Sequence, residues 1–225
     1  MSTKTAAITA VGAYVPDFIL SNQVLETMVD TNDEWITSRT GIKERRVLKG
    51  DGLGTSYLAI KAAQDLIKKS NLDPKEIDVV IVASTTPDMQ VAATAVYVAT
   101  QIGAVNAFAY DLQAACSGFL FGMSTAAAYI ESGRYKKILL IGADKMSSII
   151  DYTDRATCII FGDGAGAVLF EPNYEGLGLQ DELLKSDGIG RDYLKIDAGG
   201  SMLPASKETV ENGQHYVFQD GKTVF

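Results

Sequence analysis

Apolar and polar positions along the first 170 residues of the chain follow two different periods. Short apolar runs predict five strands, at residues 6–11, 77–83, 107–112, 138–143 and 165–170. The run Ile77–Ala83 is almost continuously apolar, which is typical of a strand covered on both faces in a parallel sheet. Helical patterns lie between the strands, so the sequence predicts an α/β fold with five strands and helices on both faces of the sheet.

Three longer stretches repeat apolar residues at the spacing of a helix that packs against a sheet. They run over residues 53–69, 91–102 and 119–130, and Asn71, Gly103 and Gly133 then provide typical helix ends.

The pattern changes after Pro172, where glycines interrupt a polar stretch without a sustained period. We expect residues 1–171 to form one core half and residues 172–225 to form an appendage of loops and short strands. The run Gly162–Gly166 precedes a strand and lacks the following helix and the lysine of a phosphate loop. We interpret it as a structural turn.

Composition and charge limit the partners and the compartment. Apolar residues make up 47% of the 225-residue chain, enough for a core, and the net charge of -8 argues against binding to nucleic acid or to an anionic membrane surface. No apolar run approaches the ~20 residues of a membrane span, and the N-terminus lacks the pattern of a signal peptide. Because Cys116 and Cys158 show neither zinc-site nor disulfide spacing, we expect a cytoplasmic protein without a metal.

Cys116 lies where a buried strand is predicted to end and a helix to begin. The free N–H groups and the positive dipole end of a helix N-terminus favour thiolate over thiol, and the backbone N–H of Cys116 can stabilise an oxyanion on an attacked thioester. Position alone leaves two readings equally open, a nucleophile and a small buried cysteine at a tight turn. Cys158 has no helix start and no basic neighbour beyond Arg155, so we expect it to be buried and inert.

A short helix is predicted to begin at Asn32 or Asp33 and to end at Gly41, with Trp35 and Arg39 four residues apart on one face. A flat ring beside a cation suits a nucleotide. The alternative is that Trp35 belongs to a core and that Arg39 is a solvated helix charge.

Five stretches resemble, in the expected order, motifs of the β-ketoacyl-acyl carrier protein synthase III family within the thiolase superfamily. They are Asp30–Ile36, Arg39–Arg45, Ala114–Gly118, Thr153–Thr157 and Phe161–Ala167. The resemblance covers the chain to about residue 170. It implies a thiolase-like α/β fold, the N-terminal half of a duplicated αβαβα core, with a five-stranded mixed, mainly parallel sheet.

The same resemblance implies roles for five side chains. Cys116 would take an acyl group from coenzyme A. Trp35 would stack on the adenine, with Arg155 on the other side of that base, while Arg39 and Thr40 would meet phosphate or pantetheine.

Val91 stands where the family has a phenylalanine that reaches across the dimer and shapes the acyl pocket. The smaller side chain would admit primers longer or more branched than acetyl, unless a neighbour such as Met89 refills the space. The alternative is that Val91 only begins its helix.

The implied function is the condensation of an acyl-CoA primer, acetyl-CoA or a somewhat larger one, with malonyl-acyl carrier protein to begin fatty acid biosynthesis. The resemblance also implies a homodimer and no cofactor besides the coenzyme A thioester that serves as substrate. The histidine and asparagine of the family's catalytic triad have no match here, and we do not transfer the role to His215, the only histidine. We expect the second half of the duplicated core to lie outside this chain, and a half-fold on its own to associate or to be unstable.

Two alternatives stay open. The chain is either a non-catalytic half that binds acyl-CoA and needs a complementary subunit, or a related enzyme such as a hydroxymethylglutaryl-CoA synthase or a secondary-metabolite ketosynthase. The stretches Asp33–Trp35 and Thr153–Arg155 favour the fatty-acid enzyme.

Overall fold

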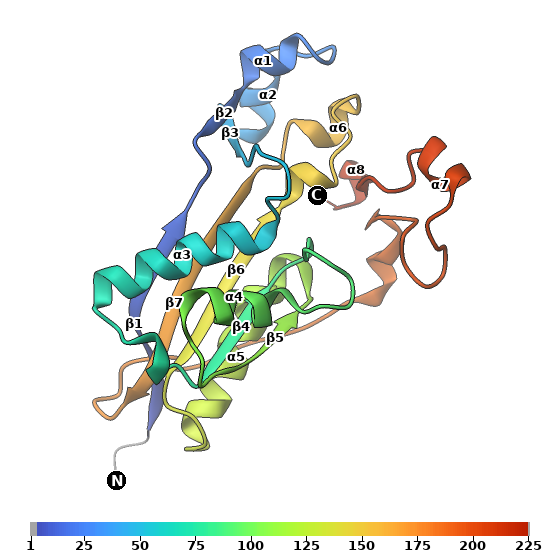
Figure 1. The fold of residues 1–225 in the computed structure, drawn as a ribbon. Helices are drawn as coiled ribbons and strands as arrows, with labels where there is room; N and C mark the ends of the chain where they lie inside the picture. The colour runs from blue at the N-terminus through green and yellow to red at the C-terminus, as the bar shows by residue number, and fades with distance from the viewer. Residues whose placement is uncertain (1–3, 225) are drawn as a thin grey trace. The chain divides into compact units, whose positions relative to one another are not determined.

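The computed structural model describes residues 4–224, whose elements are shown in Figure 1. The strands are β1 (Thr5–Tyr14), β2 (Phe18–Ser21), β3 (Glu44–Val47), β4 (Val79–Ala83), β5 (Phe108–Leu112), β6 (Ile138–Lys145), β7 (Asp163–Asn173), β8 (Leu194–Lys195) and β9 (Phe218–Gln219). The α-helices are α1 (Asn22–Glu26), α2 (Asp33–Thr40), α3 (Thr55–Ser70), α4 (Thr94–Ile102), α5 (Gly118–Glu131), α6 (Arg155–Cys158), α7 (Lys207–Glu211) and α8 (Gly221–Val224). Short 3-10 turns cover Pro74–Glu76, Ala115–Ser117, Met146–Ser148 and Gly188–Asp192.

The chain divides into two compact units that alternate along the sequence. The first, here called the sheet unit, contains the chain up to Pro16, Leu48–Lys145 and Asp163–Leu184. The second, here called the hairpin unit, contains Asp17–Val47, Met146–Gly162 and the chain from Lys185 onwards. The boundary expected after residue 171 concerns a different division, between core half and appendage, and it stays a prediction.

The sheet unit is built on a five-stranded sheet in the order β1-β7-β6-β4-β5. Strand β4 pairs in parallel with β5 and with β6, whereas β7 is antiparallel to both β6 and β1. Each strand matches one of the five apolar runs, so the prediction of an α/β fold with a mixed, mainly parallel sheet is confirmed.

Helices cover both faces of this sheet, as Figure 1 shows. All five residues of β4 are buried, and alternate side chains point to opposite faces. Val80 and Val82 pack in one cluster with α3 and α4, while Val79 and Ile81 pack in another with α5. Strand β4 thus contributes to both cores. Full burial of one such side chain stabilises the fold by about 1.5–3 kcal/mol.

The helix ends follow the expected residue types, with one correction at the start of α4. Asn71 adopts the left-handed conformation after α3 (φ 55°), and Gly103 does so after α4 (φ 82°). The apolar stripe predicted α4 to begin at Val91, but it begins at Thr94, where a carboxylate from another strand accepts the first free N–H groups. The reading in which Val91 begins its helix was therefore wrong.

The glycine run Gly162–Gly166, which the sequence predicts to be a turn, lies mostly within strand β7. Strand β7 already begins at Asp163, which pairs with Lys145, and Gly164 pairs with Asp144. None of Gly162, Gly164 and Gly166 has a positive φ. Pairing with β6 thus extends the strand over residues whose own propensity predicts a loop.

The hairpin unit packs around a smaller core. Strands β2 and β3 pair antiparallel, and Leu20, Ile36 and Cys158 are among the buried residues of its cluster. Residues 185–224 contribute only short elements, among them the two-stranded sheet of β8 and β9.

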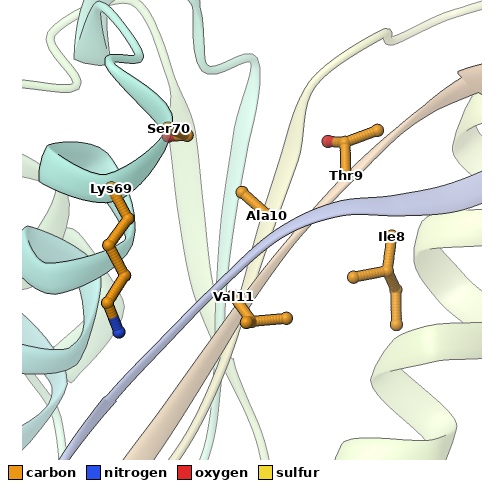
Figure 2. A pocket seen from close by; sticks show the side chains of 6 residues that line it. All are labelled: Ile8, Thr9, Ala10, Val11, Lys69 and Ser70. Atoms are coloured by element: carbon orange, nitrogen blue, oxygen red, sulfur yellow. The ribbon is translucent and has the colours of Figure 1, made fainter.

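A groove follows strand β1 at the edge of the sheet opposite to β5. It is lined by Ile8, Thr9, Ala10, Val11, Lys69 and Ser70, and Figure 2 shows the last two, from α3, beside the β1 residues. None of the site residues predicted from the sequence lines this groove. Over residues 4–224, no helix combines the length and apolar character needed to cross a membrane.

Helix α3 approaches β1 so closely that Gly12 has no room for a side chain. A Cβ atom at Gly12 would lie 2.5 Å from the backbone nitrogen of Leu66 and still closer to the carbonyl oxygen of Ala62. We expect Gly12→Ala to lower the free energy of unfolding by about 1–3 kcal/mol, because backbone atoms must shift to admit the methyl group. Urea unfolding followed by circular dichroism measures this change.

The matched control is Gly166→Ala on the neighbouring strand β7, where no atom lies within 4 Å of an added Cβ. Its expected effect is within about 0.5 kcal/mol. Equal losses in the two variants would contradict the packing argument.

Candidate active site

Cys116 lies in the turn between β5 and α5, at the position that the sequence predicts. The turn of 3-10 helix at Ala115–Ser117 connects directly to α5, which begins at Gly118. The side chain of Cys116 is exposed, so the reading as a small buried packing cysteine does not hold. The thiol is open to a ligand beside the first turn of a 14-residue helix.

The backbone immediately before Cys116 is strained. Ala115 has a φ of 46°, in the left-handed region that costs a residue with a Cβ roughly 1–2 kcal/mol. Behind the turn, a Cβ at Gly118 would lie 3.3 Å from Cβ of Ala83, so α5 begins close against β4. Strain of this kind persists only where the surrounding packing holds the turn.

A carboxylate at the end of β6 holds the loop that follows β4. Oδ1 of Asp144 accepts hydrogen bonds from the backbone N–H of Thr85 (2.8 Å) and Thr86 (3.2 Å). It also accepts from the hydroxyl groups of Ser84, Thr85 and Thr86 at 2.9–3.1 Å. The first three residues after β4 are therefore fixed to the neighbouring strand.

Two further carboxylates fix the rest of that loop. Oδ1 of Asp88 accepts the N–H of Ser56 (2.9 Å) at the start of α3. The Asp111 carboxylate, on β5, accepts the N–H of Thr94 (2.8 Å) and of Ala95 (2.7 Å) at the start of α4. Sequence reasoning missed the roles of these acids; the only signal was the place of Asp111 and Asp144 at the ends of apolar strands, and Asp88, in the loop, gave none.

Val91 lies in the loop fixed by these carboxylates. Its side chain is 97% exposed, and that of Met89 is 67% exposed. Within the described chain, neither side chain belongs to one of the hydrophobic clusters. Val91 and Cys116 thus lie on loops that follow the C-terminal ends of two neighbouring parallel strands, β4 and β5.

The hairpin unit brings together three of the four residues that the resemblance assigns to coenzyme A. The guanidinium carbon of Arg39 lies 4.5 Å from the centroid of the Trp35 ring, and that of Arg155 lies 4.9 Å from it. Arg155 also donates a hydrogen bond to the carbonyl oxygen of Asp30 at 2.9 Å. Trp35 is half-buried against the cluster that contains Ile36, so its ring has a packing role as well.

Thr40 ends the same helix, and its hydroxyl group serves the local backbone. Oγ1 donates to the carbonyl oxygen of Ile36 (2.8 Å) and accepts the N–H of Ile42 (3.0 Å). One lone pair of the hydroxyl oxygen is left for a ligand.

A buried polar network connects α2 to β3 and to the loop between them. The fully buried Asn22 donates to Oδ1 of Asp33 (2.6 Å) and to the carbonyl oxygen of Ile42 (2.9 Å), and it accepts from the buried guanidinium of Arg45. The hydrogen bond from Asn22 lowers the pKa of Asp33, and Lys43 lowers it further. Burial lowers the pKa of Arg45.

Cys158 and His215, to which the sequence analysis assigned no catalytic role, both have interactions within the protein. Cys158 is fully buried, and burial, with the nearby carboxylate of Asp154, raises the pKa of its thiol, which agrees with an inert cysteine. The ring of His215 is hydrogen-bonded through Nε2 to Oγ1 of Thr209 at 2.9 Å. Residues 4–224 contain no group of three or more His, Cys, Asp or Glu side chains that could hold a metal ion.

The structure thus places the predicted residues in two sets. Cys116 and Val91 belong to the sheet unit, while Trp35, Arg39, Thr40 and Arg155 belong to the hairpin unit.

Comparison with known proteins gives a consistent result. A family model described as 3-oxoacyl-[acyl-carrier-protein (ACP)] synthase III matches residues 110–188, a range that includes Cys116. The chain is 56% identical over its full length to beta-ketoacyl-[acyl-carrier-protein] synthase III 2 of Bacteroides thetaiotaomicron, and 54% identical to the corresponding synthase III of Phocaeicola vulgatus. It covers 67% of each of these relatives.

Solved structures agree in fold. The synthase III of Thermus thermophilus shares 39% identity with this chain at a TM-score of 0.86, over 97% of this chain and 66% of that one. The synthase III of Pseudomonas aeruginosa gives a TM-score of 0.85 at 37% identity, over 98% of this chain and 66% of that one. The chain therefore spans about two thirds of the length of the relatives that it matches, and it belongs to the β-ketoacyl-[acyl-carrier-protein] synthase III family of the thiolase superfamily.

Proposed function

We propose that Cys116 accepts an acyl group from an acyl-CoA primer and passes it on in a condensation with malonyl-acyl carrier protein. The observation that carries the proposal is the exposed thiol of Cys116 at a strained strand-to-helix turn. In the first step the thiolate attacks the thioester carbonyl, the new C–S bond forms, and coenzyme A leaves as its thiolate and takes up a proton. In the second step malonyl-carrier protein loses carbon dioxide, and the resulting carbanion attacks the acyl-cysteine and releases the thiolate of Cys116.

Coenzyme A would bind through the hairpin unit. Trp35 offers a flat ring for the adenine, and Arg155 offers a planar cation for the other side of that base. Arg39 and Thr40 would meet phosphate or pantetheine. In the structure Arg155 lies directly on Trp35, with no space for a base between ring and guanidinium. Binding of the adenine to that face therefore requires Arg155 to swing away and then to cover the bound base.

Val91 would shape the acyl pocket from outside its own subunit. An exposed valine in a loop that carboxylates hold in place suits insertion into a second copy of the chain. The active form would therefore be a homodimer. A cytoplasmic location and a carrier-protein partner are proposed from the family to which the chain belongs. Because valine is shorter than the phenylalanine that the family has at this position, Val91 leaves room for a primer larger than acetyl.

One observation favours a second candidate, an acyl-CoA-binding half that needs a complementary subunit for condensation. His215, the only histidine, is held by Thr209 within the hairpin unit and does not match the family's catalytic motif. This candidate predicts coenzyme A binding without condensation.

The first test of the proposal is the intact mass of the chain after incubation with acetyl-CoA. We expect an acetyl adduct that peptide mapping places on Cys116, and we expect Cys116→Ala to lose it completely, because alanine has no nucleophile.

Cys158→Ala is the matched control, since it removes the other thiol, which is buried. It should retain the adduct. A folded wild-type chain that binds acetyl-CoA without any adduct would rule out acyl transfer and favour the binding candidate.

The second test concerns the aromatic platform. Trp35→Leu keeps an apolar side chain on the core of the hairpin unit but removes the flat ring, so we expect the Kd for coenzyme A to rise about tenfold, the size of one lost base-stacking contact. Isothermal titration calorimetry measures the change.

The control is Tyr57→Leu in the sheet unit, which also removes a ring with a cation nearby, Lys61 at 5.4 Å. We expect no change in its Kd. If Trp35→Leu binds coenzyme A as tightly as the wild type, Trp35 has a packing role only.

A further inference from the structure

We infer that Asp111 is a positioning residue that holds the loop bearing Val91 against the strand that leads to Cys116. It thereby sets how Val91 is presented to the acyl pocket of a second copy of the chain, and so which acyl groups that pocket accepts. The part that concerns acyl groups rests on the function proposed above. Asp111 acts through the start of α4 and not directly on the thiol or the acyl group.

The start of α4 has no cap of its own. Its N-cap residue is Ala93, which offers no side-chain acceptor, and no acidic residue lies in its first turn. The N–H groups of Thr94 and Ala95 are instead taken by the two oxygens of one carboxylate, Oδ2 at 2.8 Å and Oδ1 at 2.7 Å. The negative charge of Asp111 also lies at the positive end of the helix dipole, so it replaces both functions of a missing N-cap.

This cap comes from the strand that leads to the nucleophile. Asp111 is the last residue but one of β5, and Cys116 follows after a short turn. The capped helix, in turn, begins three residues after Val91. One side chain thus connects the end of the Val91 loop to the strand from which the Cys116 turn emerges.

The other end of the loop is fixed separately. Asp144 holds Ser84–Thr86, and Asp88 connects the middle of the loop to α3. The segment between these anchors and α4 includes Met89 and Val91, whose side chains are exposed. The N–H of Asp88 also donates to Oγ1 of Thr94 at 3.2 Å, so loss of the bond from Asp111 would weaken the anchor at the C-terminal end of this segment without removing it. The position of Val91 would then be less fixed.

The experiment compares the wild-type chain with Asp111→Asn and, as matched control, Asp73→Asn. Asparagine keeps one acceptor oxygen but turns an NH₂ group toward the second N–H and removes the charge, so one hydrogen bond is lost. Asp73 also accepts a backbone N–H, from Lys75 at 3.0 Å, but it precedes β4 at the opposite edge of the sheet.

Two quantities are measured. Amide hydrogen exchange of residues 84–95, followed by mass spectrometry, should become about tenfold faster in Asp111→Asn, as expected for the loss of a charge-assisted hydrogen bond. The ratio of the acylation rates of Cys116 with isobutyryl-CoA and acetyl-CoA should shift about fivefold or more, because Val91 would no longer be held in one position. Asp73→Asn should leave both quantities unchanged.

The rate ratio separates positioning from mere loss of stability. Unfolded molecules react with neither primer, so a smaller folded fraction lowers both rates equally and leaves the ratio unchanged. Should Asp111→Asn fail to fold, Asp111→Glu keeps the charge but extends the carboxylate by one methylene group. It is expected to fold and to shift the ratio as well.

Unchanged exchange in residues 84–95 would overturn the inference, and faster exchange with an unchanged rate ratio would overturn its statement about acyl preference. A wild-type chain that takes no acyl group from either primer would instead contradict the proposed function. In that case faster exchange in Asp111→Asn would still support the anchoring role of Asp111.

Discussion

The parallel pairing of β4 with both β5 and β6 is the constraint on which the rest of the sheet unit depends. Because β4 is buried on both faces, its side chains are apolar, and the polar side chains that hold the loops lie at the C-terminal ends of the strands or in the segments that follow them. Parallel pairing delivers those segments to a single edge. Three carboxylates there, from Asp88, Asp111 and Asp144, hold loops and helix starts that have no local partners of their own.

The elements that could be predicted from the sequence are those whose signals are local. Apolar runs indicated the five strands of the sheet, and Asn71 and Gly103 indicated helix ends, because each of these signals lies within the element itself or next to it. The start of α4 could not be predicted, since its cap is donated from β5. The start of β7 was missed for the same reason: pairing with β6 overrides the glycines at that end of the strand.

The candidate site divides in a similar way. The position of Cys116 and the contact between Trp35 and Arg39 followed from spacing along the chain. The place of Arg155 beside the same ring followed only from the resemblance, because no periodicity connects residues so far apart. The hairpin of β2 and β3 was not predicted, because β3 is mostly charged. Its Arg45 can be buried because it donates to Asn22 and to the carbonyl oxygen of Ile159.

The contact of two guanidinium groups with Trp35 has a consequence for how any affinity measured at this ring is interpreted. A flat ligand that reaches the face covered by Arg155 does not add a contact to a bare surface; it substitutes for one that already exists. The observed binding free energy is then that of base stacking, reduced by the weaker cation–π contact that the base replaces and by the cost of releasing Arg155 from Asp30. A modest affinity would therefore be compatible with a close fit, and removal of Arg155 would expose the ring while also removing the group that closes over the ligand.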